Sequence, residues 1–89
     1  MQTTATMSPI GREIWLHMQR QSPPYNRSSL ARELTEDGTY PITSASISDY
    51  LYREHPPPKF VNAVARTFGL SPEEEAELHW LYFYGRNGR

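Results

Sequence analysis

Cysteine is absent from the sequence. Disulfide bonds and thiolate zinc sites are therefore excluded, and the composition suits a reducing compartment. Long apolar runs are absent too: no stretch approaches the roughly 18 apolar residues that a membrane span needs, and no basic segment followed by an apolar run opens the chain. We expect a cytoplasmic protein with no membrane association.

Sequence motifs of catalysis are also missing. The chain has no nucleophile elbow, no glycine-rich phosphate loop and no paired catalytic motif. His17, His55 and His79 are far apart in the sequence and lack the spacing of metal ligands, so we expect them at the surface or in packing. The sequence therefore predicts no enzyme, no metal site, no cofactor and no small-molecule ligand.

A strong excess of positive charge, which is common in nucleic-acid-binding domains, is the last absence. The formal net charge is −1, but four of the ten acidic residues fall within positions 73–77. Without that run, nine Lys and Arg face six Asp and Glu. A surface away from the run can therefore be positive. The acids themselves suit the start of a capped helix, so we assign them no cation.

The length of 89 residues suits a single small domain over 1–89, with 1–7 and 85–89 expected to be loose. Local signals divide it into helices. Ser8-Pro9 caps and opens a helix that runs to about Gln21, and Asn26 caps a second helix that Asp37-Gly38 ends. The stretch 39–42 is expected to be a turn, with a brief strand as the alternative.

The stretch 43–53 is central to the interpretation. Ile47 and Leu51 share one face of a helix with Tyr50 beside them, and the opposite side carries polar residues, Ser44, Ser48, Asp49 and Tyr52. Thr43 or Ser44 can cap its start after Pro41, and the prolines at 56–58 stop it. We expect a helix over 43–54 that packs by one face and presents the other.

Two further helices follow. A stripe of apolar residues from Phe60 to Phe68 predicts a helix that ends at Gly69, and the capping box Ser71-Pro72-Glu73-Glu74 opens the last helix. That last helix is apolar nearly all round, so it must be buried on more than one side. We expect its inward face to be Leu78, Leu81 and Tyr82, and a symmetric dimer interface to hold Trp80, Phe83 and Tyr84.

Two blocks carry a resemblance to a known family. The first is Asn26-Arg27-Ser28-Ser29-Leu30-Ala31, and the second is Pro58-Lys59-Phe60 with Val61, Val64, Ala65, Phe68, Gly69, Leu70 and Ser71. From Asn26 onward the chain resembles the Cro/repressor-type, or XRE, family of helix-turn-helix proteins. Between Ala31 and Ile47 it is several residues longer than is usual there, which implies a longer second helix and turn.

The resemblance implies an all-α, compact five-helix domain of the lambda-repressor-like type. It further implies a sequence-specific DNA-binding transcriptional regulator, a repressor-like homodimer at the nucleoid that occupies paired half-sites on double-stranded DNA, with the helix over 43–54 in the major groove. Base-reading is then expected from Ser44, Ala45, Ser48, Asp49 and Tyr52, and contacts to the DNA backbone from Asn26, Arg27, Ser28, Thr43, Arg53 and Lys59.

A second interpretation keeps the fold and changes the partner. An antitoxin or adaptor of the same fold would dock on a protein through its aromatic C-terminal helix. The near-neutral charge favours this alternative, and so does a presented helix without Gln or Asn, the amides that pair with adenine.

Overall fold

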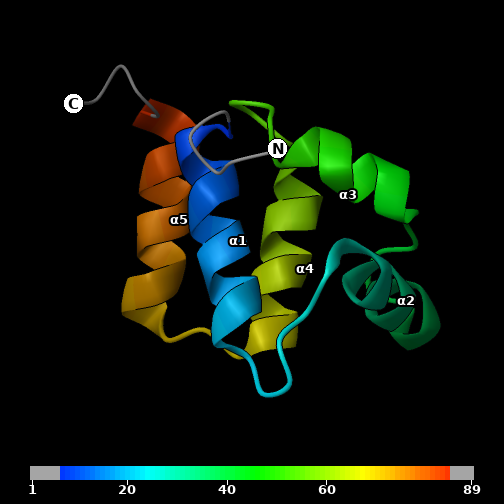
Figure 1. Cartoon of the computed structure of the whole chain (residues 1–89). Coiled ribbons are helices and arrows are strands. Elements are labelled where there is room, and N and C mark those ends of the chain that lie inside the picture. Colours follow the sequence, from blue (N-terminus) through cyan, green and yellow to red (C-terminus); the bar gives the residue numbers. More distant parts are fainter. Residues whose placement is uncertain (1–6, 85–89) are drawn as a thin grey trace.

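The computed structural model describes residues 7–84, which form five helices and no strand. The helices are α1 (Pro9–Arg20), α2 (Arg27–Asp37), α3 (Ser44–Tyr50), α4 (Pro58–Phe68) and α5 (Pro72–Tyr84) (Figure 1). The prediction of an all-α, five-helix domain is confirmed. The expected loose ends at 1–6 and 85–89 lie outside the described residues. Met7 was wrongly assigned to a loose end, because its side chain is buried in the core.

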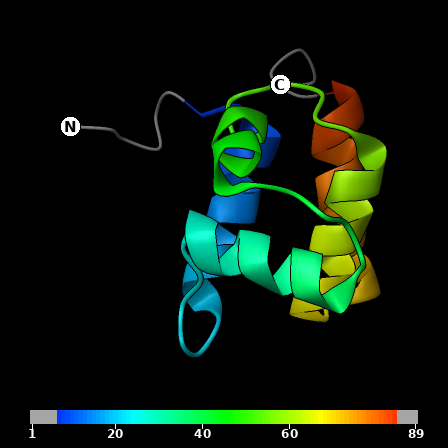
Figure 2. The same cartoon turned by 90° about the vertical axis from the view of Figure 1, so that its right-hand side faces the viewer.

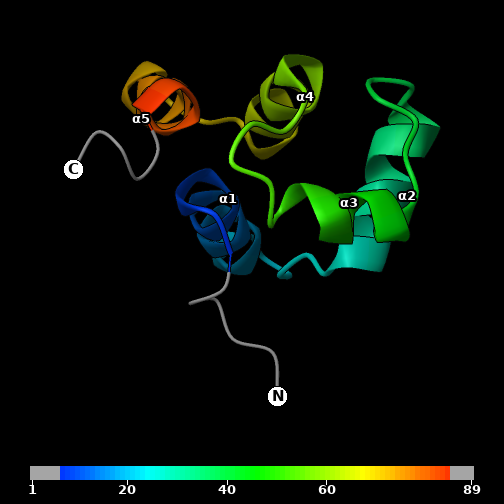
Figure 3. The same cartoon turned by 90° about the horizontal axis from the view of Figure 1, so that it is seen from above.

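Three of the helices stand side by side. Figure 1 shows α1, α4 and α5 with their axes along a similar direction, and α1 packs against both of the others. Helices α2 and α3 lie to one side of this group and pack on each other, with axes that cross steeply (Figure 2). The view from above shows α3 beside the group, between α1 and α2 (Figure 3).

The helix starts follow the predicted caps. The Ser8 hydroxyl accepts from the Gly11 amide at 3.0 Å, and the Asn26 side chain accepts from the Ser29 amide at 2.8 Å. At α5 the Glu74 amide donates to the Ser71 hydroxyl at 3.2 Å, and the Ser71 amide donates to the Glu74 carboxylate at 2.9 Å. Each cap supplies acceptors for amides that have no partner inside the helix.

The segment between α2 and α3 is a turn with no strand, as expected. Gly38 ends α2 at φ 77°, a left-handed conformation that glycine adopts without steric cost. Thr35 then fixes the segment to α2, because its hydroxyl accepts from the Ile42 amide at 3.1 Å and donates to the Ile42 carbonyl at 3.0 Å. The whole connection, residues 38–43, is longer than the three or four residues of an ordinary helix-turn-helix.

Helix α3 is shorter than predicted: it covers Ser44–Tyr50, and the prediction of a helix to residue 54 is wrong. The backbone tightens after Tyr50, where the Tyr52 amide donates to the Asp49 carbonyl and the Arg53 amide to the Tyr50 carbonyl, three residues back. The Leu51 carbonyl accepts instead from the Ser8 amide and hydroxyl, both at 3.3 Å. The N-cap residue of α1 therefore binds the carbonyl of the residue that caps the end of α3.

Gly11 makes this contact possible. A Cβ atom at this position would lie 1.7 Å from the Leu51 carbonyl oxygen, so the two backbones approach each other more closely than any side chain allows. The side chains of Ile47 and Leu51 are fully buried beneath α3, as the periodicity predicted. The end of α3 is thus held against α1 by backbone contact and by its buried apolar face.

Helix α5 buries one face and exposes the other. Leu78 and Leu81 are buried and Tyr82 packs partly against the core, as predicted. Trp80, Phe83 and Tyr84 remain 41%, 70% and 54% exposed. The expectation that this helix is buried on more than one side is therefore not met within a single described chain.

Candidate nucleic-acid interface

A shallow polar concavity of about 360 Å³ lies between the start of α2 and the outer face of α3. Its lining consists of Asn26, Arg27, Ser28, Ser44, Ala45 and Ser48. All six are residues that the sequence interpretation assigned to DNA contacts. They come from two segments that are separated in the chain, and the packing of α2 on α3 brings them together. The concavity is the candidate interface.

The local sequence explains which polar atoms of this surface are already engaged. Asn26 uses its side-chain oxygen to cap α2, and Thr43 caps α3 by accepting from the Ser46 amide at 3.2 Å. Within residues 7–84 the hydroxyls of Ser28, Ser44 and Ser48 make no hydrogen bond to the protein. These hydroxyls are therefore available to donate to, or accept from, an external partner.

Arg27 lies at the edge of the concavity in a fixed position. Its guanidinium carbon is 5.7 Å from the centre of the Trp15 ring, which places it over an aromatic face of α1. Its Nε is buried and finds no hydrogen-bond partner among the described residues. The sequence interpretation did not include Trp15 among the site residues. Its position beside the apolar stripe of α1 indicates a side chain that is only partly buried and can contact a neighbouring helix.

Asp49 and Arg53 form an ion pair on the exposed side of α3. Arg53 Nε lies 2.7 Å from Asp49 Oδ2, and the guanidinium carbon of Arg53 lies 5.4 Å from the centre of the Tyr50 ring. The sequence interpretation gave these residues separate roles, Asp49 as a base reader and Arg53 as a backbone contact. The structure makes them a single unit.

The structure places two predicted contact residues away from this surface. Tyr52 follows α3, packs partly against the core and has a buried hydroxyl, so the assignment of Tyr52 to base-reading is wrong. Lys59 does not line the concavity but a separate hollow along α4, with Tyr40 and Arg66. Its assignment to a backbone contact stays a prediction. The error at Tyr52 comes from treating nearness in the sequence as nearness on one surface.

The inner side of α3 is anchored by aromatic contacts. The Tyr50 ring lies 5.0 Å from Phe60 and the Tyr40 ring lies 6.0 Å from the same side chain, measured between ring centres. Burial raises the pKa of Tyr40 above 10.0, and its hydrogen bond with Tyr50 raises that pKa further. The Tyr40 hydroxyl therefore stays neutral at physiological pH. The ring contacts fix α3 relative to α4 and to the preceding turn.

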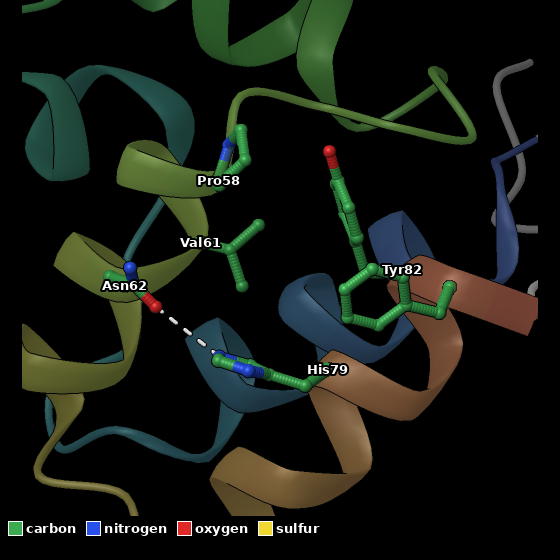
Figure 4. Close-up of a pocket in the computed structure, with 6 residues that line it drawn as sticks. Pro58, Val61, Asn62, His79 and Tyr82 are labelled. Atoms are coloured by element: carbon green, nitrogen blue, oxygen red, sulfur yellow. Dashed lines mark hydrogen bonds between the residues drawn. The ribbon is translucent and has the colours of Figure 1, made fainter.

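A second, apolar pocket of about 140 Å³ lies between α4 and α5 (Figure 4). Pro58, Val61, Tyr82 and Phe83 supply its apolar lining. At one side the Asn62 side-chain oxygen and His79 Nε2 are 3.2 Å apart, the contact marked by the dashed line. This pocket adjoins the exposed aromatic side of α5. Within residues 7–84 it shares no lining residue with the polar concavity.

Residues 7–84 contain no group of three or more His, Asp or Glu side chains arranged to hold a metal ion. None of the described helices is long and apolar enough to cross a membrane. Comparison of the chain with family models, with curated proteins and with solved structures finds no match.

Proposed function

We propose that the protein is a sequence-specific DNA-binding transcriptional regulator that presents α3 to the major groove. The observation that carries this proposal is the polar concavity, in which the start of α2 and the outer face of α3 form one surface. In a helix-turn-helix the first helix crosses the DNA backbone and the second enters the major groove. The assembled surface has the residue types that this geometry needs on both helices.

The two sides of the concavity fit two kinds of contact. On the α2 side, Asn26, Arg27 and Ser28 surround the positive end of a helix dipole, which suits a phosphate. On the α3 side, Ser44, Ala45 and Ser48 offer free hydroxyls and a methyl group to base edges. Backbone contacts would then set the orientation, and the face of α3 would read the sequence.

The charge distribution agrees with this division. The acidic run of 73–77 belongs to α5, which does not contribute to the concavity. Arg27 at the edge of the concavity is held over Trp15, so it loses little side-chain entropy when it binds a phosphate. The lining that residues 7–84 give the concavity therefore contains one cationic side chain, Arg27, and no acidic side chain.

A repressor-like homodimer follows from the same proposal. Palindromic operators present two half-sites roughly 34 Å apart, and a twofold dimer matches their spacing. The exposed side chains of Trp80, Phe83 and Tyr84 are of the types enriched at protein interfaces, and they lie on α5, away from the concavity. DNA and a second copy of the chain can thus bind at the same time.

Selection of duplexes from a random pool with the purified protein tests this function. We expect enrichment of one palindromic motif, because hydrogen-bonding to base edges distinguishes sequences. Binding to that motif should weaken steeply as salt rises, and Arg27→Ala should lower the slope of log K against log salt by about one unit. Arg20→Ala removes an equal charge from the far end of α1 and should leave the slope unchanged. A pool without enrichment would refute the proposal.

A second candidate function rests on α5. Trp80 and Phe83 form an exposed aromatic surface beside the apolar pocket between α4 and α5, which would suit docking of a partner protein by an adaptor or antitoxin. Analytical ultracentrifugation separates the candidates. The regulator should form a dimer that Phe83→Ser weakens, whereas an adaptor should stay monomeric and enrich no DNA motif.

A further inference from the structure

The ion pair between Asp49 and Arg53 lies on the presented side of α3. Both side chains are more than half exposed, at 56% and 55%, and Arg53 Nε is 2.7 Å from Asp49 Oδ2. Asp49 is on the same side of the helix as Ala45, which lines the concavity, because residues four apart share a helix face. The pair therefore extends the candidate reading surface towards the end of α3.

The pair contributes little to the stability of the fold. Exposed ion pairs four residues apart are weak because water and salt screen them. What the pair does fix is the direction of the Arg53 side chain, which would otherwise sample many rotamers. Tyr50 supplies a second restraint, since its ring lies 5.4 Å from the guanidinium carbon and itself packs at 5.0 Å from Phe60. Arg53 is therefore ordered before any partner binds.

The geometry of the restraint leaves one part of Arg53 available. Asp49 contacts Nε, on the stem side of the guanidinium, and the Tyr50 ring covers a face of the group. The two terminal Nη groups form the outer end of the side chain, beyond the Nε atom that Asp49 contacts. These are donors in a fixed fork, which matches the O6 and N7 acceptors of guanine in the major groove.

We propose that Arg53 reads a guanine through its terminal nitrogens and that Asp49 is the residue that positions it. This inference rests on the proposed DNA-binding function. It moves base-reading from Asp49 to Arg53, which the sequence had indicated as a backbone contact, and makes Asp49 a positioning residue. In this arrangement Asp49 need not approach the bases. Its negative charge is offset by Arg53, so it does not face the DNA phosphates as an unpaired charge. The fork also supplies the bidentate contact that α3, without Gln or Asn, otherwise lacks.

The test compares three variants on the palindromic duplex that the wild-type protein selects, and on duplexes with each guanine replaced in turn. Arg53→Ala should lose about 5- to 140-fold of its discrimination at one guanine per half-site and keep the preferences elsewhere. Asp49→Ala should lose discrimination at the same guanine while binding all duplexes more tightly at low salt, because a negative charge is gone. Asp49→Asn retains an acceptor for Nε and should preserve more of that discrimination than Asp49→Ala.

The outcomes separate the inference from the function beneath it. If Arg53→Ala weakens all duplexes equally and lowers the salt slope by about one unit, Arg53 contacts a phosphate and the inference is overturned while the DNA-binding function stands. Discrimination that survives in Asp49→Ala would remove the positioning role. If the wild-type protein selects no motif, the function and the inference fail together. Equal melting temperatures across the variants exclude a folding defect as the cause.

Discussion

Replacing Gly11 by alanine tests the contact that fixes α3 against α1. A Cβ atom at position 11 would lie 1.7 Å from the carbonyl oxygen of Leu51, 2.6 Å from its carbonyl carbon and 2.9 Å from its Cα. All three atoms belong to the backbone, so no side chain can rotate away. The two segments must move apart by more than about 1 Å, because Cβ atoms do not approach other atoms within 3.0 Å.

The magnitude follows from three effects. Overpacking of this kind costs about 1–3 kcal/mol. The movement also breaks the two hydrogen bonds from Ser8 to the Leu51 carbonyl, at about 1 kcal/mol each. Helix propensity acts in the other direction, since alanine is better than glycine inside a helix by about 1 kcal/mol. We expect Gly11→Ala to lower the free energy of unfolding by about 2–4 kcal/mol.

Urea denaturation followed by far-UV circular dichroism measures this change. The matching fall in Tm is at least about 8 °C for a domain of this size. Arg12→Ala is the control, because it places alanine at the next, exposed position of the same helix and should change stability by less than about 0.5 kcal/mol. A Gly11→Ala protein as stable as the wild type, or more stable, would show that propensity outweighs the contact and would refute the reasoning.

Two further predictions concern other parts of the fold. Thr35→Val removes both hydrogen bonds to Ile42 and should lower the free energy of unfolding, measured by urea denaturation, by about 1–2 kcal/mol. The control is Thr67→Val, which removes a buried hydroxyl with no partner in the described part of the chain and should leave that free energy unchanged. Equal effects of the two substitutions would contradict the role of Thr35. The Ser71 amide lowers the pKa of Glu74 below 4.5, so its carboxylate stabilises the fold above that pH and the contribution is lost as the pH falls through the lowered pKa. Glu74→Gln should therefore lose less stability on acidification than the wild type, and Glu73→Gln, a charge removal in the same turn, should not reproduce this effect.

Helix starts were predictable because their causes are local. Ser8, Asn26, Thr43 and Ser71 each bind an amide three residues away, so the sequence alone contains both partners. The buried faces of the helices were predictable for the same reason, since residues three and four apart share a face whatever the helix packs against. Ile47 and Leu51 lie in the core where the periodicity put them.

The candidate site was predictable in its membership and only partly in its arrangement. The residues of the polar concavity were all identified, because both helices that supply them begin at recognisable caps. Tyr52 was misplaced, because the chain leaves the helix after Tyr50 and packs the Tyr52 side chain partly against the core. The pairing of Asp49 with Arg53 was missed, although their spacing of four residues favours an ion pair wherever the chain stays helical or nearly so.

By itself the sequence determined where helices begin, which faces they bury and which polar residues remain for a partner. Only the tertiary structure decided how the chain leaves α3, because the carbonyl of its C-cap residue Leu51 accepts from Ser8, a residue 43 positions away. The same holds for the meeting of Asn26 with Ser44 and for the seat of Arg27 on Trp15. Capping and periodicity act within one helical turn, whereas these contacts exist only after separate helices have packed.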